Sequence, residues 1–226
     1  MKKLLTLALA LLMVLSLTGC GSSEGSDKPG PKKEVEFQLA TVEKGVYKNP
    51  FLGIGFKFKE AGMHENSQTG GIYRTDVKPE DLEETVSNGT VMELLCQNYE
   101  NNSFNKDAFN SIMTIEVTKD IRDMYNPVNF MSFKESQRVE SASENYENIE
   151  HRQITQVIGD AEFNGFELMF TMSNVITGGE RHLFLKKGQY CYYITVISMF
   201  FGEELKTQDL IRENLDEILN KYFYEL

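Results

Sequence analysis

Four apolar segments follow one another closely between residues 154 and 197, and this spacing limits the folds open to the chain. The segments are Ile154–Ile158, Phe166–Met172, Arg181–Leu185 and Tyr190–Ile197. Glycine-containing stretches separate them, at Gly159-Asp160, Asn164-Gly165, Thr177-Gly178-Gly179 and Lys187-Gly188-Gln189. Because connections this short join antiparallel neighbours, the pattern predicts an antiparallel sheet.

Three further strands and three helices are predicted outside this region. The strands are Gly53–Phe58, Val91–Cys96 and Ile112–Val117. The two glycines of the first strand predict a close approach by other backbone. The helices are Pro79–Glu84 with a stop at Asn88-Gly89, Phe133–Ile149, and Glu203–Tyr222. The last helix has an apolar stripe of Leu210, Ile211, Leu215, Ile218, Leu219 and Tyr222. Together these elements predict the α+β class, as an αβα sandwich with a mainly antiparallel sheet flanked by helices.

The order of the elements also resembles a known family. Tyr47-Lys48-Asn49 precedes the glycine-rich first strand, and the last helix ends in Ile218–Phe223. With the middle helix and the closely spaced strands, this order is similar to the PsbP-like fold over roughly residues 45–224. The chain departs from the family at Glu60–Met63, where members commonly have a proline and then a tryptophan. The resemblance implies an αβα sandwich that binds or assists a partner rather than an enzyme.

The N-terminus has the three parts of an export signal. Lys2 and Lys3 precede an apolar run, Leu4–Leu17, which ends in Leu17-Thr18-Gly19-Cys20. That run is shorter than the about 20 residues that span a bilayer. Its end resembles the bacterial lipoprotein box, which implies cleavage before Cys20 and a diacylglyceryl group on its sulfur. The alternative is an ordinary cleaved signal with Cys20 beside the cleavage site by chance. We expect a lipid-anchored protein on the extracytoplasmic face of the bacterial cell membrane.

Domain boundaries and net charge follow from this interpretation. We predict a signal peptide over residues 1–19, a lipidated flexible tether over 20–34 and a single PsbP-like α+β domain over 35–226. Eight of the thirteen residues from 21 to 33 are Gly, Ser or Pro, so this segment cannot bury enough apolar surface to fold. Loss of Lys2 and Lys3 changes the formal net charge from −11 to −13. This acidic balance argues against nucleic acid as a partner.

No motif for catalysis, metal or cofactor binding stands out. The histidines, His64, His151 and His182, are far apart in the sequence, and none forms a pair with helical ligand spacing. The oxygen-rich loop 98–107 lacks the alternating carboxylates and central glycine of a calcium loop. Cys96 and Cys191 lie in apolar segments, where we favour two reduced core thiols over a disulfide. We therefore assign no catalytic residue, no metal ligand and no cofactor.

The densest aromatic group is Tyr190, Tyr192, Tyr193, Phe200 and Phe201. Tyr190 and Tyr192 share one face of a strand, and Tyr193 lies on the other. Core packing is one interpretation of the group. The other is that Tyr190, Tyr192 and Tyr193 contact an envelope protein or a glycan, since tyrosine is favoured at interfaces.

These features favour a membrane-anchored lipoprotein with a non-catalytic binding or accessory domain. One alternative is an exported hydrolase whose site is assembled only in three dimensions, from a cleft with shifted pKa values. A second is a transporter-associated substrate-binding lipoprotein, although its usual two lobes need a longer chain.

Overall fold

The computed structural model describes residues 36–67, 71–99, 104–120, 126–173, 175–202 and 206–226. Val35–Leu226 form one compact unit. The predicted signal peptide, the tether and Cys20 lie outside the described residues.

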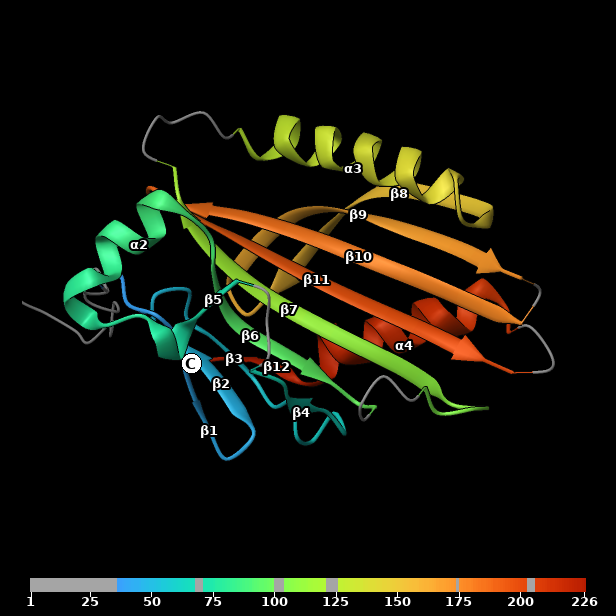
Figure 1. Ribbon diagram of the computed structural model, residues 1–226, viewed down its shortest axis with the longest axis horizontal. Coiled ribbons are helices and arrows are strands. Elements are labelled where there is room, and N and C mark those ends of the chain that lie inside the picture. Colours follow the sequence, from blue (N-terminus) through green and yellow to red (C-terminus); the bar gives the residue numbers. More distant parts are fainter. Residues whose placement is uncertain (1–35, 68–70, 100–103, 121–125, 174, 203–205) are drawn as a thin grey trace, which may run out of the picture. The chain divides into compact units, whose positions relative to one another are not determined.

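An eight-stranded sheet is the largest part of this unit (Figure 1). Its strands are β4 (His64–Glu65), β5 (Ile72–Tyr73), β6 (Val91–Gln97), β7 (Phe109–Lys119), β8 (Glu147–Ile158), β9 (Ala161–Met172), β10 (Ile176–Lys187) and β11 (Tyr190–Phe201). Their order is β4-β6-β7-β11-β10-β9-β8, with β5 paired to β6. All pairs are antiparallel except β5 with β6. The antiparallel sheet predicted from the sequence is confirmed.

Two glycine stretches that were predicted as turns lie inside strands. Gly178 and Gly179 belong to β10, and the chain reverses earlier, so that Met172 pairs with Ile176. A Cβ on Gly178 would lie 2.5 Å from the Phe170 ring, and one on Gly179 would lie 2.5 Å from the Met169 sulfur. The two glycines make room for neighbouring side chains within a strand. The prediction of a turn at Thr177-Gly178-Gly179 was therefore wrong. The Asn164-Gly165 stretch likewise lies within β9.

A second sheet of four strands was not predicted as such. It contains β1 (Thr41–Glu43), β2 (Val46–Asn49), β3 (Ile54–Phe56) and β12 (Phe223–Glu225), in the order β1-β2-β3-β12. Only β3 corresponds to a predicted strand. A Cβ on Gly55 would lie 2.3 Å from the Tyr224 ring, so a side chain of β12 makes the close approach that we expected from backbone.

The described residues contain three α-helices: α2 (Leu82–Asn88), α3 (Pro127–Ser143) and α4 (Gln208–Lys221). Short 3-10 helices, η1 (Arg74–Asp76) and η2 (Pro79–Asp81), precede α2. α3 begins six residues before the predicted Phe133, because Asn126 caps the amides of Val128 and Asn129 and Pro127 takes the first helical position. It also ends earlier than predicted. Tyr146 stacks on Phe170 at 4.0 Å and leads into β8 instead.

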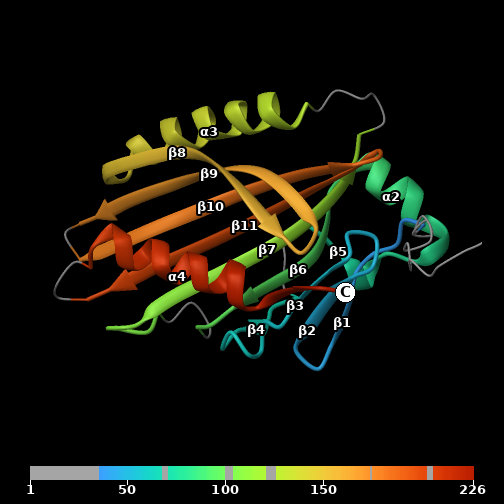
Figure 2. The same ribbon diagram turned by 180° about the vertical axis from the view of Figure 1, so that it is seen from behind.

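The two long helices lie on opposite faces of the large sheet. On β10, Glu180 bonds Arg138 of α3, whereas the next residue, Arg181, bonds Asp216 of α4. In Figure 1, α3 lies over the part of the large sheet formed by β8, β9 and β10. Figure 2 shows α4 and the small sheet together on the other face of the large sheet. The predicted α+β class and the helix–sheet–helix layering are confirmed, and the small sheet is an addition to them.

The main core lies between the large sheet on one side and α4 with the small sheet on the other. From α4 it receives Ile211, Leu215, Ile218 and Leu219, all buried as predicted. Leu210 is 38% exposed and Tyr222 is half-buried, so the apolar stripe is narrower than expected. Cys96 and Cys191 are buried free thiols.

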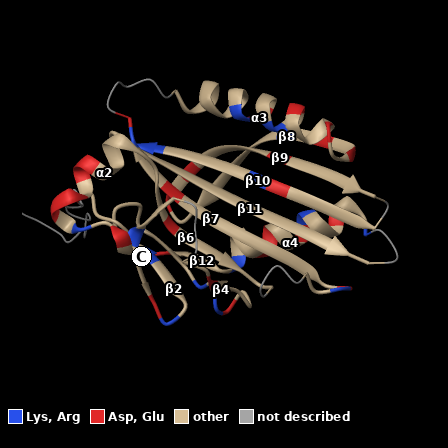
Figure 3. Cartoon of the chain, viewed as in Figure 1, with Lys and Arg blue, Asp and Glu red and all other residues tan. Residues whose placement is uncertain are grey.

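In Figure 3 the Lys and Arg residues of the described part are scattered over many elements, whereas acidic residues gather on α2.

Candidate functional site

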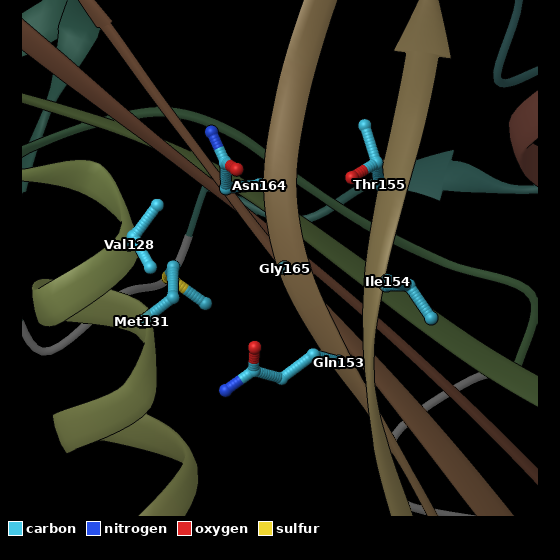
Figure 4. Close-up of a pocket in the computed structure, with 7 residues that line it drawn as sticks. All are labelled: Val128, Met131, Gln153, Ile154, Thr155, Asn164 and Gly165. Carbon is cyan, nitrogen blue, oxygen red and sulfur yellow. The ribbon is translucent and has the colours of Figure 1, made fainter.

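A pocket of about 220 Å³ lies between the first turns of α3 and the strands β8 and β9 (Figure 4). Its lining residues are Val128, Met131, Gln153, Ile154, Thr155, Asn164 and Gly165. The early start of α3 creates the helix wall, because Val128 and Met131 belong to its first turns. Gly165 gives β9 its close contact with β10, since a Cβ there would lie 2.3 Å from the His182 carbonyl oxygen.

Gln153 is held in one orientation by α3. Its Nε2 donates to Ser132 Oγ at 3.1 Å and to Glu135 Oε2 at 3.2 Å. Glu135 is only 9% exposed, and its other oxygen lies 2.8 Å from His151 Nδ1. With its N–H groups used in this way, the Gln153 amide points its carbonyl oxygen between Met131 and Gly165 (Figure 4). Gln153 therefore offers the pocket a fixed hydrogen-bond acceptor.

Thr155 and Asn164 supply the other polar groups of the pocket. They are opposite each other in the β8–β9 register. Thr155 is exposed and Asn164 is half-buried. Within the described part of the chain, neither side chain hydrogen-bonds to another protein group, so both remain available to a ligand. A hydroxyl and an amide can each donate and accept.

A second polar cluster joins α3 to the sheet. Arg138 donates to both oxygens of Glu180, at 2.8 Å and 2.5 Å, and His182 Nε2 lies 2.9 Å from the same carboxylate. His182 Nδ1 lies 2.7 Å from the Tyr193 hydroxyl. Burial alone raises the pKa of Glu180, but the bonds from Arg138 and His182 outweigh it and hold the pKa at about 2. Because both carboxylate oxygens and both imidazole nitrogens have partners, this cluster fixes α3 on the sheet.

A third cluster ties the small sheet to the large one. The buried carboxylate of Glu93 accepts from Tyr47 Oη at 2.6 Å, from Asn49 Nδ2 at 3.0 Å and from the Ala40 amide at 3.0 Å. Asn49 Nδ2 also donates to Tyr192 Oη at 3.3 Å. Burial raises the pKa of Glu93, and these donors offset only part of the effect. Tyr47, Asn49, Glu93 and Tyr192 are all fully buried, so we assign this cluster a structural role.

The three predicted partner-binding tyrosines occupy three different environments. Tyr190 is half-buried, stacks on Phe37 at 3.6 Å and donates its hydroxyl to Glu83. Tyr192 is fully buried and offers no surface to a partner. Tyr193 lies on the opposite face, half-buried in the His182 cluster. They do not form one platform, and partner contact by Tyr190 and Tyr193 stays a prediction.

The histidines are also dispersed. His64 lies on β4, His151 on β8 and His182 on β10. Among the residues that the structure describes, no group of three His, Cys, Asp or Glu side chains is placed to hold a metal ion. The pocket residues were not recognised from the sequence, because Gln153, Thr155 and Asn164 meet only through the sheet register and the position of α3. A weak signal was present in Asn164, a polar residue on a strand that is otherwise largely buried.

No protein-family model matches the chain, and no curated protein matches it. Two similar solved structures are a cyanobacterial PsbP (CyanoP) from Synechocystis sp. PCC 6803 and LpqN, involved in cell envelope biogenesis of Mycobacterium tuberculosis. The first has 8% identity and a TM-score of 0.43, covering 92% of this chain and 99% of its own. The second has 8% identity and a TM-score of 0.41, covering 74% and 92%. Nothing about the function of this chain follows from likenesses at this level, and the PsbP-like interpretation stays a prediction.

None of the described helices is long and apolar enough to cross a membrane.

Proposed function

We propose that this chain is a membrane-anchored extracytoplasmic lipoprotein of the bacterial cell envelope whose PsbP-like domain binds a ligand or partner without catalysis. The anchor is the lipid on Cys20, and the domain is the compact unit from Val35 onward. Two acyl chains hold a protein stably at a bilayer, because each buried methylene contributes about 0.8 kcal/mol.

The N-terminal sequence supports the anchor. The charged start, the apolar run and Leu17–Cys20 have the order and spacing of a lipoprotein signal. The described part of the domain begins close behind the tether. Phe37 stacks on Tyr190 and makes an edge contact with Phe51 at 5.4 Å, so the first described residues pack against the rest of the domain.

The lining of the pocket is the observation that carries the binding role. Catalysis needs a nucleophile, a base or a metal within hydrogen-bond reach of the substrate. The pocket instead presents one threonine and two amide side chains beside the apolar side chains of Val128 and Met131. Such groups orient a ligand by hydrogen bonds and contact, whereas none of them titrates near neutral pH.

Cell fractionation of the Cys20→Ala variant tests the anchor. We expect the wild-type protein to sediment with membranes and the variant to remain unprocessed or to leave the membrane fraction. Processing and membrane association of the variant like those of the wild type would contradict lipidation at Cys20.

An activity panel tests the absence of catalysis. We expect the purified full chain to turn over no ester, phosphate, glycoside or peptide substrate, with or without added divalent metal. An activity that co-purifies with the chain and disappears on replacing His64, His151 or His182 would favour the exported hydrolase instead.

A further inference from the structure

We propose that the pocket between α3, β8 and β9 binds a single uncharged sugar ring of an envelope glycan. This inference rests on the proposed binding function and names the ligand class that the pocket accepts. It depends on three properties of the lining: its charge, its hydrogen-bonding groups and its apolar wall.

The lining excludes charged ligands. None of its seven residues is ionisable. Glu135 is the carboxylate that hydrogen-bonds to a lining residue, because it accepts from Gln153. It is nearly buried, and its other oxygen faces His151. An ionic ligand would give up its hydration without meeting an opposite charge, which costs several kcal/mol. The group that enters the pocket is therefore neutral.

The polar groups call for a ligand with closely spaced donors and acceptors. Gln153 offers a fixed acceptor, since its Nε2 is bonded to Ser132 and Glu135. Asn164 and Thr155, opposite each other in the register, each offer both a donor and an acceptor. Adjacent hydroxyl groups of a sugar satisfy this set, because every hydroxyl donates once and accepts twice.

The remaining walls suit the C–H surface of a ring. Val128 and Met131 approach from α3 (Figure 4), whereas the side chain of Ile154 points away from them and packs against the main core on the other face of the sheet. The volume of about 220 Å³ is below the roughly 300–1,000 Å³ of pockets for drug-sized ligands. It can hold one ring of a longer glycan, and the rest of the glycan would extend into solvent past Val128, which is 55% exposed.

Ligand-observed NMR and calorimetry on the detergent-solubilised full chain test the proposal. The probes are N-acetylglucosamine, its β-1,4-linked trimer, glucuronate as a charged sugar, and an uncharged tripeptide. We expect the two neutral sugars to bind and glucuronate and the peptide not to bind.

Asn164→Leu keeps the side-chain size but removes the carbonyl oxygen and the NH₂ group of the amide. It should weaken binding by about tenfold or more, the effect of losing one or two hydrogen bonds.

Two further variants separate binding from folding. Thr155→Val changes an exposed side chain and should also weaken binding while the melting temperature is retained. Gln156→Leu is the matched control on the same strand, because Gln156 bonds Asn220 of α4 on the other face of the sheet. Its binding should equal that of the wild type.

Absence of sugar binding, equal binding by Asn164→Leu, or tighter binding of glucuronate or the peptide would each overturn the proposal. These outcomes leave the anchor experiment on Cys20 untouched, so failure of the sugar site and failure of the proposed membrane anchoring are distinguishable.

Discussion

Glu93 and Glu180 are both buried carboxylates, but their surroundings move their pKa values in opposite directions. Burial dominates at Glu93 and raises its pKa, because its carboxylate accepts only from neutral donors and the Arg74 guanidinium bonds the Glu93 backbone carbonyl instead. Glu180 meets the Arg138 guanidinium in a two-point contact, which favours the ionised form and lowers its pKa to about 2. The comparison shows that the partners, rather than burial alone, decide the direction of each pKa shift.

Replacing Glu180 tests this account at the scale of one residue. Glu180→Gln leaves Arg138 and His182 without their carboxylate, and breaking a buried ion pair costs about 3–5 kcal/mol. We expect a loss of this size in the free energy of unfolding at pH 7, measured by urea denaturation. Glu213→Gln, an exposed position on α4, is the control and should change little.

The same pair of proteins has a defined pH dependence. The folded pKa of Glu180, about 2, is below its ordinary value of 4.5, so its contribution to stability is present above pH 4.5 and is lost as the pH falls toward 2. The wild type should therefore lose stability more steeply than Glu180→Gln across this window. Parallel curves for the two proteins would show that Arg138 does not stabilise the ionised form.

At the scale of elements, periodicity predicted the existence of strands better than their ends. The last helix was predicted from its apolar stripe, and four of the six stripe residues are buried. The turn predicted at Gly178-Gly179 was wrong. A glycine that makes room for a neighbour such as Met169 cannot be distinguished by local sequence from a glycine that turns the chain. Strands β1, β2 and β12 of the small sheet were missed since they have three or four residues, too few for a periodic pattern.

Shortening the side chain of Leu215 tests the packing of the last helix, α4. Leu215 is fully buried, and Leu215→Ala should lower the free energy of unfolding by about 2–5 kcal/mol, through lost burial and the cavity that remains. Leu210→Ala, at the 38% exposed position of the same helix, should cost much less. Equal denaturant midpoints for the two variants would contradict the orientation of α4.

A methyl group at Gly179 tests why β10 contains glycine. Gly179→Ala would place Cβ 2.5 Å from the Met169 sulfur and 2.8 Å from Ile211 Cγ2. We expect a loss of about 1–3 kcal/mol in unfolding free energy, as is typical of overpacking. Gly89→Ala is the control, since no atom lies within 4 Å of its added Cβ. A stable Gly179→Ala protein would mean that α4 can move away from β10 at little cost.

At the scale of the whole molecule, the anchor is a prediction from contiguous sequence and the pocket is a result of the fold. Leu17–Cys20 can be recognised because the signal is read as a linear segment. Gln153 and Asn164 come together with Val128 of α3 only after β8 pairs with β9 and the helix lies across both strands. No local pattern encodes that meeting, so the sequence predicted a binding domain but not this pocket.

The intact mass of the membrane-extracted protein tests the central claim most directly. We expect a mature chain that has lost residues 1–19, begins at Cys20 and carries the mass of a diacylglyceryl group on that residue. Fragmentation should locate the added mass at the first residue. A mature chain that begins elsewhere, or that begins at Cys20 with an unmodified thiol, would contradict the account of a lipid-anchored envelope protein.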